Sequence, residues 1–346
     1  MNNLIIDPTT LSIITTYRCT SSCKDCCFQS NPRRKEKLTV SEIKNYISET
    51  IKAYDSIKVL VLTGGECFLY GKKLEDIIKH ASSYGLVTRV VTNGFWAKNY
   101  NKAEETINRL VTAGLNEINF STGDDHLEYV SIETIKNGII ASLKYNLTIA
   151  VNVESGDWKK FNFNSLREDA SLKEFVNNGK LKIINGMWIP FTRSTLDEAK
   201  SAKQISKDIV KFKPYQRCTN IFNSITIDPN HRMMACCGLT SKYIKHLDLG
   251  NVGKFPIPEL YNKQFSDFLK IWIATEGPHK IMDFISKYTA LDDTNYTEHH
   301  ACQVCERIFN REDYLQIVQK EYKSIYSNII LKHLFNKKQL ENETTE

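Results

Sequence analysis

Three cysteines near the amino terminus constrain this chain more than any other feature. Cys19, Cys23 and Cys26 are spaced C-x3-C-x2-C and follow an apolar run at residues 11–14. Cysteine thiolates hold iron–sulfur clusters, and a cluster normally takes four of them. Three ligands leave one iron open, and an open position is typical of a catalytic rather than a structural metal site. A zinc ribbon is the alternative interpretation of the same residues.

This spacing resembles the cluster loop of the radical S-adenosylmethionine (SAM) superfamily. In that family the open iron binds the amino and carboxylate groups of SAM, and reduction releases a 5′-deoxyadenosyl radical. Most members carry an aromatic residue before the third cysteine, whereas this chain has Asp25 there and Cys27-Phe28 afterwards. The resemblance implies a [4Fe-4S] cluster on the three cysteines, with SAM bound to it.

Composition narrows the class of protein. The chain has 346 residues, which suggests two domains, and a hydrophobic content of 41% supplies a sizeable core. We expect no membrane span and no signal peptide, hence a cytoplasmic protein. Ten cysteines in a cytoplasmic chain favour metal binding or catalysis over disulfides. The net charge of +6 comes without a basic cluster, so we expect no nucleic-acid partner.

Apolar segments alternate with segments of helical periodicity through the first part of the chain. This alternation predicts parallel βαβ units, and six units are three-quarters of a (β/α)8 barrel of about 250 residues. The expected fold class is α/β, a partial (β/α)6 TIM-type barrel, which is the core that radical SAM enzymes have. Expected strands span residues 11–16, 57–63 (apolar, expected to be buried on both faces), 86–92, 116–121, 147–153 and 181–189, and expected helices include 39–54 and 165–177.

The pattern changes near Lys213-Pro214, where we place a domain boundary. Residues 224–236 predict a hairpin that turns at Asp228-Pro229-Asn230, and residues 311–334 predict a helix. The expected domains are a radical SAM barrel at 1–213, a small auxiliary iron–sulfur domain at 214–340 and a disordered tail at 341–346.

The resemblance also implies which residues contact SAM. Gly64-Gly65-Glu66 corresponds to the motif that binds the methionyl amino group, and glycine lets backbone approach a ligand closely. Asn93 and Ser121, after the third and in the fourth expected strands, match positions that often contact SAM. Arg193 ends a segment similar to the Pro-x-Gly-Arg sequence of members with an auxiliary cluster, and would pair with the SAM carboxylate. Ordinary turns, a strand edge and a surface arginine are the alternatives.

Five further cysteines form a second group. They resemble the C-terminal auxiliary-cluster domains of the SPASM or shortened twitch type, and their number suits one auxiliary [4Fe-4S] cluster. A zinc knuckle is the alternative. His126, His299 and His300 could also ligate a metal, but we assign them to no site. The expected ligands of the second group are Cys218, Cys236, Cys302 and Cys305.

The fifth thiol, assigned to Cys237, is the expected catalytic hydrogen donor. Adjacent strand residues point to opposite faces, so Cys236 and Cys237 should not share one cluster. Which of the two is the ligand stays open, and Cys27 and Cys67 are rival donors.

Within the superfamily the cysteine framework is most similar to epimerases of ribosomally synthesised peptides. The expected function is L-to-D epimerisation by α-hydrogen abstraction, and a thioether- or carbon–carbon-crosslinking maturase is the first alternative. A non-catalytic iron–sulfur or zinc protein is an alternative of another class. The expected partners are a precursor peptide and an electron donor such as flavodoxin or ferredoxin. The peptide itself cannot be deduced from this chain.

Overall fold

The computed structural model describes residues 4–155, 161–187, 215–291, 296 and 300–343. The chain divides into two compact units, which are described separately below. The barrel unit comprises residues 11–211 and 228–230, and the second unit comprises residues 1–10, 212–227 and 231–346. The first ten residues therefore group with the C-terminal part of the chain.

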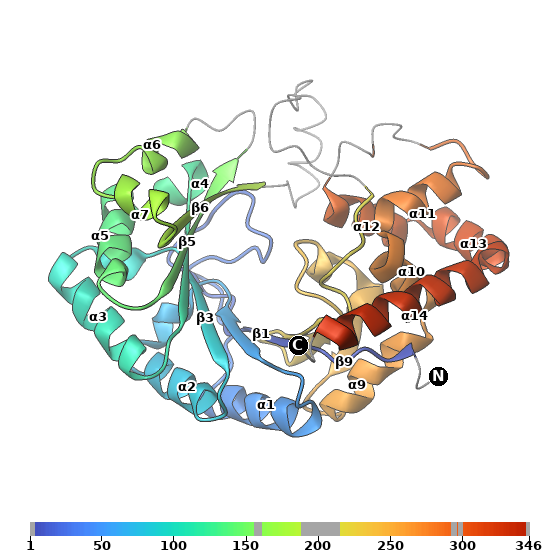
Figure 1. The fold of residues 1–346 in the computed structure, drawn as a ribbon, viewed down its shortest axis with the longest axis horizontal. Helices are drawn as coiled ribbons and strands as arrows, with labels where there is room; N and C mark the ends of the chain where they lie inside the picture. The colour runs from blue at the N-terminus through green and yellow to red at the C-terminus, as the bar shows by residue number, and fades with distance from the viewer. Residues whose placement is uncertain (1–3, 156–160, 188–214, 292–295, 297–299, 344–346) are drawn as a thin grey trace. The chain divides into compact units, whose positions relative to one another are not determined.

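The barrel unit contains six strands in the order β6-β5-β4-β3-β2-β1, and the pairs from β2 to β6 are parallel. The sheet does not close, so the predicted α/β fold with a partial barrel is confirmed. Helices α1, α2, α3 and α5 cover one face of the sheet (Figure 1). The strands are β1 (Thr10–Ile14), β2 (Val59–Thr63), β3 (Val87–Thr92), β4 (Glu117–Thr122), β5 (Thr148–Ser155) and β6 (Leu181–Met187); the helices are α1 (Val40–Ala53), α2 (Lys73–Ser82), α3 (Tyr100–Thr112), α4 (Asp124–Leu127), α5 (Ile132–Leu143), α6 (Phe163–Arg167) and α7 (Lys173–Asn177).

Burial alternates along β2, β3 and β4, because successive side chains point to opposite faces. Ile118 and Phe120 in β4 are fully buried, and Phe120 lies against Gly138 of α5, where an added Cβ would meet its ring at 2.8 Å. In β2 only Leu60 and Leu62 are fully buried, while the intervening residues are half-buried. The expectation that this strand is buried on both faces was therefore wrong.

One predicted helix of the barrel unit is broken. Residues 165–177 were expected to form a single helix, but α6 ends at Arg167 and α7 begins at Lys173. Between them the Asp169 carboxylate accepts hydrogen bonds from the backbone N–H and hydroxyl of Ser171, at 2.9 and 2.5 Å. Such local bonds compete with helical ones, which explains the break.

In the second unit, three strands that pair antiparallel in the order β7-β8-β9 precede a series of helices. The predicted hairpin is confirmed, since β7 and β8 pair with Thr226 opposite Met234. The helix expected at 311–334 is interrupted by a 3-10 turn at Tyr322–Ser324, and the final helix continues to Glu343, into the segment expected to be a tail. Its elements are β7 (Ser224–Ile227), β8 (Arg232–Met234), β9 (Asp248–Asn251), α9 (Ile257–Lys263), α10 (Phe268–Glu276), α11 (Pro278–Ile285), α12 (Ala301–Asn310), α13 (Glu312–Glu321) and α14 (Tyr326–Glu343).

Side chains from later in the second unit bind the backbone of its amino-terminal segment. The Tyr261 hydroxyl donates to the carbonyl of Ile6 at 2.7 Å, and His333 Nε2 lies 2.9 Å from the carbonyl of Leu4. Both side chains are buried. A search of the described residues for a helix of sufficient length and apolar character to cross a membrane finds none.

Candidate functional site

The first cysteine group occupies the loop that follows β1. Cys19 is buried, and Cys23 and Cys26 are partly buried. The sulfur of Cys19 accepts the backbone N–H of Ser21, and the sulfur of Cys26 accepts that of Ser30, both at 3.4 Å. Hydrogen bonds of this kind tune thiolate sulfurs that hold iron–sulfur clusters.

The Gly64-Gly65 pair holds the start of this loop by close backbone contact. Gly65 donates its N–H to the carbonyl of Thr16 at 2.7 Å, and Glu66 donates its own to the carbonyl of Arg18 at 3.0 Å. A Cβ atom on Gly65 would lie 2.2 Å from the Arg18 carbonyl oxygen, and one on Gly64 would lie 2.5 Å from that of Thr16. Only glycine fits at these two positions without a shift of backbone.

The side chain of Glu66 joins the loop after β2 to the loop after β3. Its carboxylate accepts the backbone N–H of Phe68 at 3.0 Å, the backbone N–H of Asn93 at 2.8 Å and the hydroxyl of Thr92 at 2.9 Å. Glu66 is completely buried. Burial raises its pKa to about 7, although these hydrogen bonds oppose the shift.

Asn93 connects β3 directly to the cysteine loop. Its amide nitrogen lies 3.0 Å from the hydroxyl oxygens of both Thr20 and Ser21 and 3.6 Å from the sulfur of Cys19. Its side-chain oxygen accepts the backbone N–H of Phe95 at 3.1 Å. The Asn93 side chain thus helps to fix the conformation of the cysteine loop. The SAM contact predicted for Asn93 stays a prediction.

Residues after β4 and β5 reach the same loop, and the sequence analysis did not assign them. Asp125 accepts the backbone N–H of Asp25 at 3.2 Å, and the Tyr129 hydroxyl donates to the carbonyl of Ser22 at 3.1 Å. Glu154, at the end of β5, accepts the backbone N–H of Asp125 at 2.8 Å. In the sequence, Asp125 follows the fourth expected strand and Glu154 follows the fifth. Barrel enzymes carry their sites at the carboxyl ends of strands, so these two positions could have indicated both residues.

His126, considered as a metal ligand from the sequence, is paired with Glu154. Glu154 accepts the backbone N–H of His126 at 3.2 Å, and its carboxylate also bonds to Nδ1 of the same residue. The side chain of Glu154 has no exposed surface. A carboxylate bonded to one ring nitrogen determines the orientation of the imidazole.

The raised pKa values of the thiols in the cysteine loop are consistent with binding of a metal cluster there. Burial raises the pKa of the Cys19 thiol to about 11, and burial followed by the neighbouring Cys26 raises that of Cys23 well above its usual value. Glu154 and Asp125 also contribute to the shift of Cys23. Buried thiolates need a compensating positive charge, which coordinated metal supplies. The three thiols, of which Cys19 and Cys26 accept N–H groups, therefore fit an iron–sulfur cluster.

Of the two remaining predicted SAM contacts, the structure describes Ser121 but not Arg193. Ser121 pairs with Asn152 of β5 and lies between Phe120 and Thr122, which are both buried. Alternation therefore directs Ser121 to the face of the sheet opposite these two residues. Arg193 lies outside the described residues, as does His299.

The second cysteine group is assembled from three segments of the second unit. Burial raises the pKa of Cys302 to about 11, and burial followed by other cysteines of the group raises the pKa values of Cys236 and Cys305 well above their usual range. Cys218 contributes to all three shifts. A Cβ added to Gly238 would lie 3.4 Å from the sulfurs of both Cys236 and Cys302. The four predicted ligands are thus close enough to interact.

Backbone contacts and a helix cap hold the second group. Cys218 donates its backbone N–H to the carbonyl of Ile273 at 3.1 Å, and the Thr240 hydroxyl donates to the carbonyl of Cys302 at 2.8 Å. His300 caps the amino terminus of α12, since its Nδ1 accepts the backbone N–H of Cys302 at 3.1 Å. His300 therefore supports a cysteine through its helix.

The cysteine doublet differs in exposure. Cys236 is 8% exposed, whereas Cys237 is exposed. The doublet lies beyond the end of β8 at Met234, so the premise that both residues belong to a strand was wrong. Of the rival donors, Cys67 is buried and donates its thiol to the carbonyl of Val91 at 3.3 Å, and Cys27 is partly buried.

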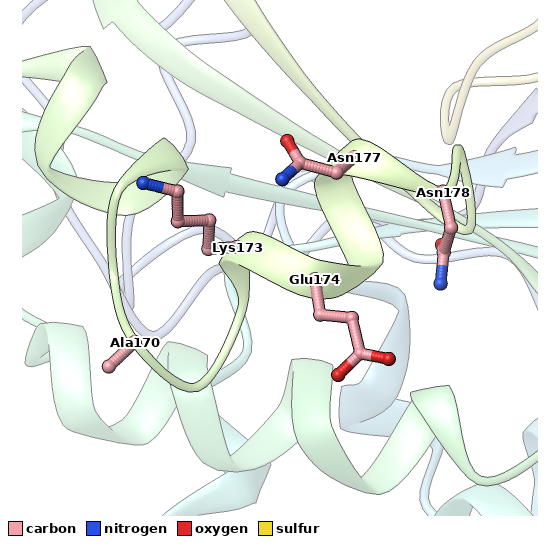
Figure 2. Close-up of a pocket in the computed structure, with 5 residues that line it drawn as sticks. All are labelled: Ala170, Lys173, Glu174, Asn177 and Asn178. Carbon is pink, nitrogen blue, oxygen red and sulfur yellow. The ribbon is translucent and has the colours of Figure 1, made fainter.

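The described residues also form a pocket at α7 and another lined in part by Cys218, Phe222 and His333. Within the described ranges, no three His, Cys, Asp or Glu side chains, those of the two cysteine groups included, are grouped so as to hold a single metal ion. A surface depression at α7 is lined by polar side chains that point in different directions (Figure 2). One of them, Lys173, is already paired with Glu168 at 2.6 Å.

Comparison with known proteins finds a family match for part of the chain. Residues 13–136 match the model of the Radical SAM superfamily, and this range includes the cysteine loop, Gly64-Gly65-Glu66, Asn93 and Asp125. This range is therefore similar to a radical SAM domain. The family implies a [4Fe-4S] cluster and SAM as cofactors of this domain.

The chain is also similar to a curated protein and to solved structures. The putative peptide biosynthesis protein YydG of Bacillus subtilis (strain 168) is 30% identical over 145 residues, which are 42% of this chain and 45% of that protein. The chain thus matches less than half the length of this relative. Two structures of anSMEcpe, one with AdoMet and one with AdoMet and the Cp18Cys peptide, share the fold. They have TM-scores of 0.55 and 0.52 at 11% identity, and cover 93% and 94% of this chain and 98% and 99% of theirs.

Proposed function

We propose that this chain is a radical SAM enzyme that modifies a ribosomally synthesised peptide, most specifically by L-to-D epimerisation. The observation that carries the proposal is the cysteine loop, in which the sulfur of Cys19 accepts hydrogen bonds from the backbone of Ser21 and from Asn93, and that of Cys26 accepts one from the backbone of Ser30. The name of the relative, a putative peptide biosynthesis protein, supports a peptide substrate. A reduced cluster with bound SAM supplies a radical that takes a hydrogen atom from carbon.

Cys19, Cys23 and Cys26 would hold this cluster. The proposed SAM contacts are Gly64, Gly65, Glu66, Asn93, Ser121 and Arg193. The side chain of Glu66 also accepts the backbone N–H of Asn93, and that of Asn93 also donates to Thr20 in the cysteine loop. The second unit, with Cys218, Cys236, Cys302 and Cys305, would hold the auxiliary [4Fe-4S] cluster. Its interacting, buried thiols support this assignment.

Cys237 is the proposed hydrogen donor, and its exposure is the feature that supports this role. Inversion requires that hydrogen return to the face of the α-carbon opposite the one from which it was taken. A thiol S–H bond is weak enough to give that atom, which leaves a sulfur radical. This radical must regain one electron and one proton, and an electron donor of the flavodoxin or ferredoxin class would supply the electron.

The test uses the full chain, reconstituted anaerobically, and a short peptide encoded beside its gene. Wild-type enzyme in deuterated water should place one solvent deuterium on an inverted residue. Cys237→Ala should still cleave SAM but form no D-residue, whereas Cys236→Ala should lose auxiliary iron. If both variants epimerise normally, the donor assignment fails. A product lighter by two hydrogens per modification would favour crosslinking instead.

A further inference from the structure

Three successive strand ends hold the cysteine loop, and each binds a different part of it. The loop after β2 binds the backbone at Thr16 and Arg18, and Asn93 after β3 binds Thr20 and Ser21. The segment after β4 binds the backbone at Ser22 and Asp25. The second half of the loop, which contains Cys23 and Cys26, therefore depends on the segment after β4.

That segment is itself shaped by one carboxylate from the next strand. Glu154 accepts the backbone N–H groups of Asp125 and His126, and its carboxylate also bonds to the His126 ring. Gly123 permits this approach, because its φ is +126° and an added Cβ would lie 2.5 Å from the Cβ of Glu154. The carboxylate is completely buried, so these bonds are protected from water.

We propose that Glu154 is a positioning residue for the cysteine loop, acting through Asp125 to hold the backbone on which Cys23 and Cys26 are presented.

Amide hydrogen exchange on the metal-free full-length chain tests the positioning directly. In Glu154→Gln an amide NH₂ group replaces one of the carboxylate oxygens that accept backbone N–H groups, so a hydrogen bond to a charged group is lost. The backbone amides of peptides covering residues 19–30 should then exchange hydrogen about ten-fold faster, as expected for such a loss. Peptides from α5 serve as the reference for the fold. Glu117→Gln is the matched control, since Glu117 starts β4 at the opposite end of the sheet and pairs with Arg89 at 2.7 Å.

Unchanged exchange of the loop in Glu154→Gln overturns the proposal. If that variant also loosens α5, Asp125→Ala decides, because it removes the acceptor for Asp25 and leaves Glu154 in place. Unchanged loop exchange in Asp125→Ala then overturns the proposal.

Discussion

The two cysteine groups are held in contrasting ways. The first lies on one loop, between Cys19 and Cys26, and is held by side chains and glycines from neighbouring strand ends. The second is collected from three segments between Cys218 and Cys305, and is held mainly by backbone bonds and by the cap of α12. In the first group the ligands are close in sequence, and much of their support comes from distant strand ends. In the second the ligands are distant in sequence, and only the cap of α12 by His300 is local, because Cys218 binds Ile273 and Cys302 binds Thr240.

The largest expected effect is the loss of the second group's iron while the first group keeps its own. Cys302→Ala/Cys305→Ala removes two proposed ligands, so the chain should retain about four of about eight irons if each group holds a four-iron cluster. Iron analysis after anaerobic reconstitution measures this. A zinc content of one equivalent in the wild-type chain, alongside only four irons, would contradict an iron–sulfur assignment for the second group.

Gly65→Ala tests how strictly the first loop depends on its support. The added Cβ would meet the Arg18 carbonyl oxygen at 2.2 Å, and relief of that clash must move backbone at the start of the loop. We expect a loss of about 1–3 kcal/mol in the free energy of unfolding and poor loading of the first cluster. Gly186→Ala is the control, because its Cβ would meet its nearest neighbour at 3.5 Å. Equal iron loading in both variants would contradict this account of the loop.

Asn93→Ala should have an intermediate effect confined to the first group. It removes the amide that donates to Thr20, Ser21 and Cys19. A buried hydrogen bond contributes about 1 kcal/mol, so iron should leave the first cluster several-fold faster in the presence of a chelator. The release rate from the second group should not change, and an equal acceleration from both groups would show that the variant acts on the whole fold.

His300→Ala should have the smallest effect and should act on the second group alone. Loss of the cap of α12 costs about 0.5–2 kcal/mol in the free energy of unfolding, measured by denaturant titration. His300→Asn should recover most of this, because asparagine is a good N-cap. Failure of asparagine to restore stability, together with loss of iron in both variants, would indicate that the imidazole is a ligand rather than a cap.

The sequence predicted the parts of the molecule that depend on local pattern. The period of apolar residues predicted the six strands of the barrel unit, and the C-x3-C-x2-C spacing predicted the family. The break between α6 and α7 was not predicted, because it depends on the bonds of Asp169 to Ser171, which compete with an otherwise helical pattern. The contribution of Glu154 was not predicted either, since its partners lie 28 and 29 positions away and meet it only when β4 and β5 pair.

Formation of 5′-deoxyadenosine tests the central claim most directly. Wild-type protein, reconstituted with iron and sulfide and reduced in the presence of SAM, should release 5′-deoxyadenosine, detected by liquid chromatography and mass spectrometry. The Cys19→Ala/Cys23→Ala/Cys26→Ala variant should release none, while it retains the iron of the second group. SAM cleavage by this triple variant at the wild-type rate would contradict the assignment of the cysteine loop as the site of the chemistry.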